Sequence, residues 1–94
     1  MRARHGALTA NQVATIDLGS IPISASIYVV NVSASSPFYV RLDGVDPTVM
    51  GEDCRVVLSF RRFPARSEFW NGSLVQQVKM ICAEDATYAV EVGR

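Results

Sequence analysis

The amino-acid sequence predicts an all-β domain of about seven short strands in an immunoglobulin-like or jelly-roll β-sandwich, with a small barrel as the alternative. Three observations predict this class. Apolar residues recur with a period of two along most of the chain, as they do in half-buried strands. Turn residues interrupt that pattern at roughly the 8–12-residue spacing that is typical of sandwiches. No stretch combines the length of a helix with its 3.6-residue period.

In the first half of the chain, the pattern predicts three strands. The first covers about 12–18 and is broken by the Gly, Ser and Pro residues of 19–22. The second is the apolar, β-branched run 26–32, which we expect to be buried on both faces. After a small polar turn at 33–37, apolar residues alternate along 38–43, which predicts a half-buried strand.

The second half contains a strand over 55–64, then a hairpin, then a closing strand over 88–92. The hairpin turn is Asn71-Gly72, because a type I′ turn needs positive φ at both central residues. It would pair 68–70 with 73–75, and the second arm would continue to 82. The apolar positions that these strands place on one face are Val56, Leu58 and Phe60, then Val78, Met80 and Cys82, then Tyr88, Val90 and Val92.

The chain has 94 residues, enough for one core and too few for two. We expect an N-terminal arm over 1–11 and a single sandwich domain over 12–94. Nine basic and nine acidic residues cancel, which disfavours binding to nucleic acid or to a membrane surface. Polar residues interrupt the segment that follows the basic N-terminus, so no secretion signal is expected. We therefore expect the chain to fold in a cytoplasm.

Catalysis and cofactor binding are not expected. His5 is the only histidine, and a terminal arm holds a general base poorly. A Ser/Lys pair through Lys79 has no supporting motif. Cys54 and Cys82 lack metal-ligand spacing and are expected to be free thiols, with a disulfide as the alternative. No metal, cofactor or small-molecule substrate is therefore predicted.

The loop 43–53 holds four carboxylates, which are those of Asp43, Asp46, Glu52 and Asp53. Clustered oxygen ligands suit Ca²⁺, but the spacing does not match an EF-hand. Asp-Gly and Asp-Pro are also ordinary turn sequences, because the Asp side chain accepts hydrogen bonds from nearby amides. Turn chemistry is the favoured interpretation and a cation site is the alternative.

The next segment combines arginines with aromatic residues, the composition of interface hot spots. It contains Arg55, Arg61, Arg62 and Arg66 among Phe60, Phe63, Phe69 and Trp70. A protein interface is the first interpretation. The alternatives are that Phe60 and Phe69 lie in the core beneath solvated arginines, or that the segment stacks on single-stranded nucleic acid. Reversing Arg61 and Arg62 to Glu should weaken assembly if this basic segment meets the acidic loop of a neighbouring copy.

Several segments resemble small β-sandwich virion structural proteins of tailed phages, especially those that infect actinobacteria. The most specific is 40–49, with the sequence VRLDGVDPTV. Weaker similarity extends over 7–18, 27–31, 78–82 and 88–92, and thus over most of the chain. No shared pattern covers 63–70, so the resemblance does not support a specialised contact there.

The resemblance implies a capsid decoration protein that binds the outer surface of the major capsid lattice, or else a tail or head–tail connector component. Its partners would be the major capsid protein and copies of itself, and its location would be the capsid surface. The candidate contact residues are Arg61, Arg62, Phe63, Arg66 and Trp70, together with Arg2 and Arg4 of the N-terminal arm. A carbohydrate-binding module that uses Trp70, Tyr39 and Tyr28 is a further alternative.

Overall fold

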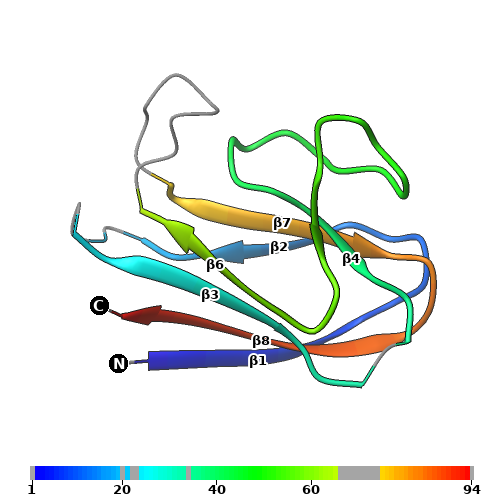
Figure 1. The fold of residues 1–94 in the computed structure, drawn as a ribbon, viewed down its shortest axis with the longest axis horizontal. Helices are drawn as coiled ribbons and strands as arrows, with labels where there is room; N and C mark the ends of the chain where they lie inside the picture. The colour runs from blue at the N-terminus through cyan, green and yellow to red at the C-terminus, as the bar shows by residue number, and fades with distance from the viewer. Residues whose placement is uncertain (1, 20, 22–23, 34, 66–74, 94) are drawn as a thin grey trace.

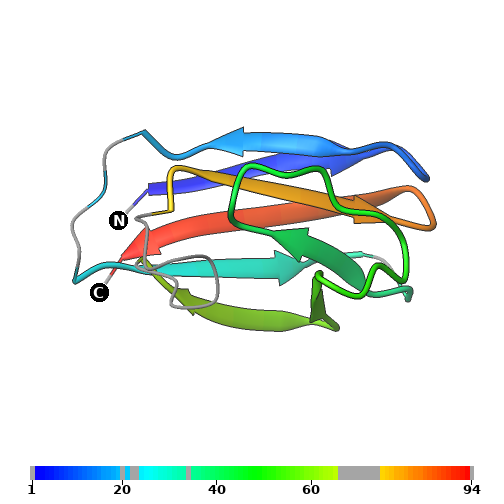
Figure 2. The same cartoon turned by 90° about the horizontal axis from the view of Figure 1, so that it is seen from above.

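The computed structural model describes residues 2–19, 21, 24–33, 35–65 and 75–93. It consists of two antiparallel sheets packed face to face (Figures 1 and 2), which confirms the predicted all-β sandwich. In spatial order, sheet A contains β1 (Arg2–Leu8), β8 (Ala86–Gly93), β3 (Ser26–Asn31) and β6 (Phe60–Pro64). Sheet B contains β2 (Ala14–Asp17), β7 (Gln77–Cys82), β4 (Phe38–Arg41) and β5 (Arg55–Val57). Within the described ranges, no helix long and apolar enough to cross a membrane is present.

The strand order selects the jelly roll over the immunoglobulin-like alternative. β1 pairs with β8, β2 with β7, β3 with β6, and β4 with β5, all antiparallel. These nested pairs are those of one long hairpin that has been rolled up, so that alternate pairs fall in opposite sheets. Pairing of β3 with β8 and of β4 with β7 then closes each sheet. This is the double-sheet arrangement of jelly rolls.

The core lies between the sheets and follows the alternation seen in the sequence. Ile27 and Val29 of β3 face Phe38 and Val40 of β4 across it, and all four are fully buried. Val78, Met80 and Cys82 are also fully buried, as the pattern predicted. Burial of apolar area at about 25 cal/mol per Å² makes this layer the main source of stability. The predicted Asn71-Gly72 hairpin lies outside the described residues.

The predicted arm over 1–11 is wrong, because β1 is a strand of sheet A. Its residues pair in register with β8 from Arg2↔Val92 to Leu8↔Ala86, and Leu8 belongs to the core. β1 lies at a sheet edge, where charged side chains are common because they discourage pairing with other chains. Gly6 lies directly beneath the ring of Tyr88, so that an added Cβ would come within 2.6 Å of the ring carbon Cζ. The charged residues and Gly6 of β1 do not follow a strand pattern, so the sequence did not predict this strand.

The predicted strand over 55–64 is two strands in different sheets. The chain bends at Leu58 and Ser59, passing from β5 in sheet B to β6 in sheet A. Val57 and Phe63 are buried, whereas Val56, Leu58 and Phe60 are 41%, 73% and 57% exposed. Apolar residues occupy 56, 57 and 58 in succession, so alternation alone does not decide which face is buried. The alternation therefore predicted the wrong set of buried residues: the positions expected to face the core are exposed.

Four connections, which we call the corner connections, carry the chain between the sheets at one end of the strands: 9–13, 32–37, 58–59 and 83–85 (Figure 1). Hydrogen bonds tie them to one another. The Ala10 amide donates to Asp85 Oδ1 at 2.8 Å, and the Ser36 amide donates to Glu84 Oε1 at 2.7 Å. The buried Asn31 side chain donates through Nδ2 to the carbonyls of Ser36, at 2.9 Å, and Leu58, at 3.1 Å. Asn31 thereby connects the end of β3 to the bend between β5 and β6.

Replacing Asn31 with Ala should lower the free energy of unfolding by about 2–3 kcal/mol, because two partly buried carbonyls lose their donor. Asn31→Asp preserves the shape and removes the donor, so it should be at least as destabilising. The exposed Gln76→Ala is the control and should stay within about 0.5 kcal/mol of the parent. Urea denaturation monitored by circular dichroism measures all three. An Asn31→Ala variant as stable as the control would contradict the anchoring role.

Candidate interaction surface

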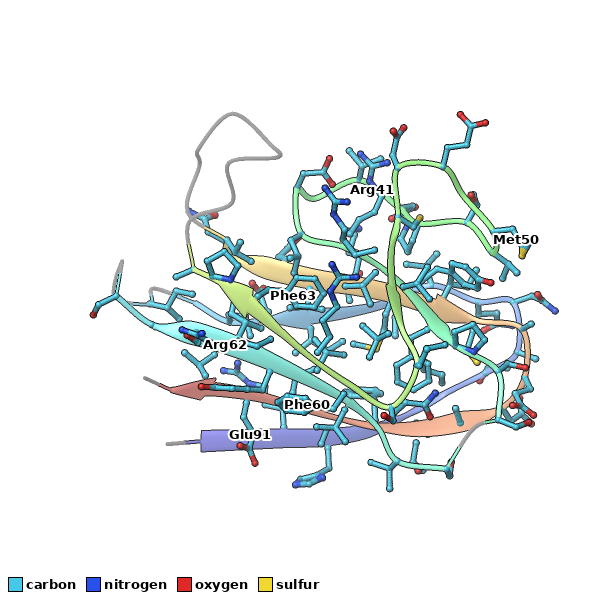
Figure 3. The ribbon with its side chains drawn as sticks, viewed as in Figure 1. Arg41, Met50, Phe60, Arg62, Phe63 and Glu91 are labelled. Atoms are coloured by element: carbon cyan, nitrogen blue, oxygen red, sulfur yellow. The ribbon has the colours of Figure 1, made fainter. Side chains whose placement is uncertain are left out.

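The outer face of sheet A, which points away from the core, brings together side chains from three neighbouring strands. Tyr28 of β3 lies directly across from Arg62 of β6 on one side and from Glu91 of β8 on the other. One row along, Val30 lies across from Phe60 and from Ala89. Directly opposed residues share a face of a sheet. We call Tyr28, Val30, Phe60, Arg62 and Glu91 the Phe60 face. Figure 3 labels Phe60, Arg62 and Glu91 of this face.

The Phe60 face is apolar along β3 and β6, and it is most accessible at the β6 edge. The Phe60 ring stacks on the Tyr28 ring, with centroids 5.8 Å apart and planes inclined by 28°, yet Phe60 remains 57% exposed. Val32 and Leu58, 59% and 73% exposed, continue apolar character past the ends of β3 and β6. Neighbouring exposed apolar residues on one face are typical of protein contact sites, whereas scattered ones need no explanation.

The prediction that 26–32 is buried on both faces is correct only for the inner face. Ile27 and Val29 are fully buried, whereas Tyr28 and Val30 are half-buried and Val32 is exposed. β3 lies between β8 and β6, inside its sheet, where a strand that is apolar on both faces is normally covered on both. In this chain alone, the outer face of β3 has no covering layer among the described elements.

Arg61 and Arg62 are adjacent and point to opposite sides of β6. Arg62 lies on the Phe60 face, where its Nε donates to Ser26 Oγ at 2.8 Å. Arg61 lies on the core side, with its guanidinium carbon 5.3 Å from the Phe63 ring centroid. Its Nη1 donates to the Val56 carbonyl at 3.1 Å, which links the edge of sheet A to the edge of sheet B. Arg62 therefore belongs to the candidate surface, and Arg61 closes the side of the sandwich.

The structure separates the other predicted contact residues. Phe63 is 5% exposed and packs in the core, so the prediction that it contacts a partner is wrong. The alternative that placed Phe60 in the core is wrong as well, because β6 turns that ring outward. Arg4 is half-buried in β1, and Arg55 is half-buried in β5. Arg66, Phe69, Trp70 and the side chain of Arg2 lie outside the described residues.

Sequence reasoning did not place Tyr28 or Glu91 at the protein-contact surface. Tyr28 was considered only for sugar stacking, within a run that was predicted to be buried on both faces. Glu91 was not singled out because it is an ordinary polar position of an alternating strand. The usable signal was the apolar character of both faces of 26–32. Such a strand makes its outer face a candidate contact surface.

In the acidic loop, three of the four carboxylates pair with basic side chains. Arg41 forms a bidentate contact with Asp43, with Nε to Oδ1 at 3.1 Å and Nη2 to Oδ2 at 2.5 Å, and it approaches Asp53 at 3.6 Å. Lys79 pairs with Asp46 at 2.8 Å. Asp43 Oδ1 also accepts the Val45 amide at 3.2 Å, which is the expected turn chemistry.

The environment of Asp43 holds its pKa below the ordinary value. The largest cause is the hydrogen bond from Arg41, and partial burial opposes it. The same bond raises the pKa of Arg41. Both side chains are about 85% buried, at 14% and 15% exposed, so this pair is more protected from solvent than an ordinary surface ion pair. Across the described part of the chain, no three His, Cys, Asp or Glu side chains gather into a metal-binding group.

Both cysteines are free thiols, which confirms the favoured expectation over a disulfide. Cys82 is buried in the core, and Cys54 is half-buried in the loop that leads into β5. The Cys54 thiol lies 3.6 Å from the Thr48 carbonyl. Gly51 sits against both, since a Cβ there would come within 2.9 Å of Cys54 Sγ. The cysteines thus serve packing.

Comparison of the chain with family models, with curated proteins and with solved structures finds no match. The similarity to phage virion proteins therefore remains a prediction from the sequence. Function is inferred below from the residues of the chain and their arrangement.

Asp43→Asn should lower the free energy of unfolding at pH 7 by about 2 kcal/mol, because Arg41 loses a charged hydrogen-bond partner. The pKa of Asp43 is lower in the folded chain than its ordinary value in the unfolded chain. Its stabilisation is therefore complete above about pH 4 and is lost as the pH falls through the lowered value. The variant should lose less stability on acidification than the parent.

Urea denaturation between pH 7 and pH 2 measures this difference. The Glu84 carboxylate, whose pKa is lowered by hydrogen bonds from Ser36 and Ser35, leaves a residual acid dependence in the variant. Asp46→Asn is the matched control, because Asp46 is 69% exposed in its ion pair and should contribute about 0–1 kcal/mol. Identical pH profiles of stability for Asp43→Asn and the parent would contradict the assignment of this acid-dependent stability to Asp43.

Proposed function

We propose that this chain is a non-enzymatic structural subunit that works by binding protein through the Phe60 face. The observation that carries the proposal is the outer face of β3, where Tyr28 and Val30 lie inside the sheet and no other described element forms a layer over them. Covering that face in an assembly removes exposed apolar area from water, at about 25 cal/mol per Å².

The chemistry of the face suits a protein better than the other partners that were considered. Aromatic residues and arginine are enriched at the buried centres of interfaces, and Phe60, Tyr28 and Arg62 lie together here. Glu91 sits in the same row and opposes binding to a nucleic-acid backbone. The net charge of zero likewise supplies no general attraction to phosphates.

Within this class, we propose a phage virion protein, most specifically a capsid decoration protein that stabilises the outer surface of the major capsid lattice. The resemblance over 40–49 supports this assignment, as does the jelly roll, an architecture found in viral capsid domains. Fold alone does not establish function, so the Phe60 face remains the main support. Many copies on a lattice would bind cooperatively even where each contact is weak.

Two other roles compete with capsid decoration. A tail or head–tail connector component would use the same face, and only its position in the particle would differ. A carbohydrate-binding module is disfavoured by the aromatic residues, because Tyr39 is buried with its hydroxyl against Met50 Sδ at 3.3 Å. Tyr28 is stacked with Phe60, and Trp70 lies outside the described residues.

Phe60→Ser should reduce the amount of this chain that cosediments with phage heads by about tenfold or more, because the aromatic anchor of the Phe60 face is lost and neighbouring copies no longer strengthen one another's attachment. Met50→Ser is the matched control: Met50 is 77% exposed, and it lies in the loop that follows β4, outside sheet A. It should leave cosedimentation unchanged. In cryo-electron microscopy of the particle, we expect density for this chain on the head.

The same particles distinguish the competing roles. Density confined to the tail or neck would overturn decoration in favour of the connector role. Absence from purified particles would overturn a virion role altogether. Binding to a glycan array by the isolated chain, abolished by Tyr28→Ala, would favour the carbohydrate-binding module instead.

A further inference from the structure

The Phe60 face is arranged so that it complements itself. On its outer side, β6 carries the bulky residues Phe60 and Arg62, and β8 carries Ala89 and Glu91 in the same two rows. β3 runs between them with Val30 and Tyr28. The large apolar ring thus shares a row with a small residue, and the positive charge shares a row with a negative one.

We propose that the Phe60 face binds the same face of a second copy of this chain, about a twofold axis that runs nearly parallel to β3 above Tyr28. This inference rests on the proposed role of the Phe60 face and names its partner. Rotation about that axis exchanges the β6 side with the β8 side. Arg62 then lies over the second copy's Glu91, and Phe60 lies over the second copy's Ala89. The two Tyr28 residues meet near the axis.

The charges support a second copy over an unrelated protein. Arg62 and Glu91 are separated by two strand spacings, or about 10 Å, with Tyr28 between them. A partner must therefore present a negative and a positive group at the same separation, in reversed order. A second copy rotated about the twofold axis does so without any further requirement, and each dimer gains two such ion pairs. Isologous contacts of this kind are the commonest in symmetric oligomers.

The geometry of the sheets is compatible with this contact. Two twisted sheets pack face to face at about 10 Å with their strands inclined by about 30°, which the twofold axis reproduces when it is tilted from β3 by half that angle, about 15°. Arg62 is held over the face by its hydrogen bond to Ser26 Oγ, which reduces the side-chain entropy lost on pairing. Arg61 points to the core side of the same strand and takes no part in the contact.

The test uses charge reversal on the full chain, with self-association measured by sedimentation equilibrium. Arg62→Glu places two negative charges in one row, and Glu91→Arg places two positive charges there. Each variant alone should have its dimer dissociation constant raised about a hundredfold or more, because like charges face each other twice. Circular dichroism confirms that each variant is folded.

The decisive sample is an equimolar mixture of the two variants. In a mixed dimer, position 62 of each chain again faces the opposite charge at position 91 of the other, so dimerisation should return. Restoration in trans is not explained by an effect on the fold of one chain. Arg61→Glu is the matched control, since it reverses the adjacent charge on the other side of β6 and should leave dimerisation unchanged.

The outcomes separate this inference from the proposed function. A parent chain that stays monomeric at the highest concentration reached, or a mixture that stays monomeric, would overturn the twofold dimer. A monomeric chain that still decorates phage heads would retain the function and lose the dimer. A chain that dimerises as described but is absent from the particle would retain the dimer and lose the virion function.

Discussion

The hydrogen bonds among the four corner connections are the constraint on which the rest of this fold depends. In a jelly roll, each of these connections carries the chain from one sheet to the other, so their lengths and directions set which residues face inward. Asn31 is central because its buried side chain links the end of β3 to both Ser36 and Leu58. A buried amide with satisfied partners favours one arrangement strongly, since any shift leaves polar groups unpaired.

The bend at Leu58 and Ser59 decides which residues of this segment reach the Phe60 face. It moves the chain into sheet A and turns Phe60 outward and Phe63 inward. Arg62 then reaches the outer face, while its neighbour Arg61 closes the side of the sandwich. Among the described residues of this segment, Phe60 and Arg62 therefore lie on the outer face, whereas Phe63 lies in the core.

The acidic loop illustrates how tertiary contacts decide between two interpretations of the same residues. Its carboxylates would suit a cation if they converged, but Asp43 faces Arg41 and Asp46 faces Lys79 instead. Arg41 lies at the end of β4 and Lys79 on β7, strands that pair in sheet B. The loop is thus held to the sheet by its charges.

By itself, the sequence determined that this protein is an all-β sandwich, and it identified much of the core, because period-two alternation is a local property. Phe38, Val40, Val78 and Met80 are buried as their pattern indicates. It did not determine the edge strand β1, whose charges and Gly6 lack strand propensity and which is held by pairing with β8. The jelly-roll order and the outward placement of Phe60 were decided by tertiary structure, since pairing between strands distant in sequence sets which sheet, and hence which face, each residue joins.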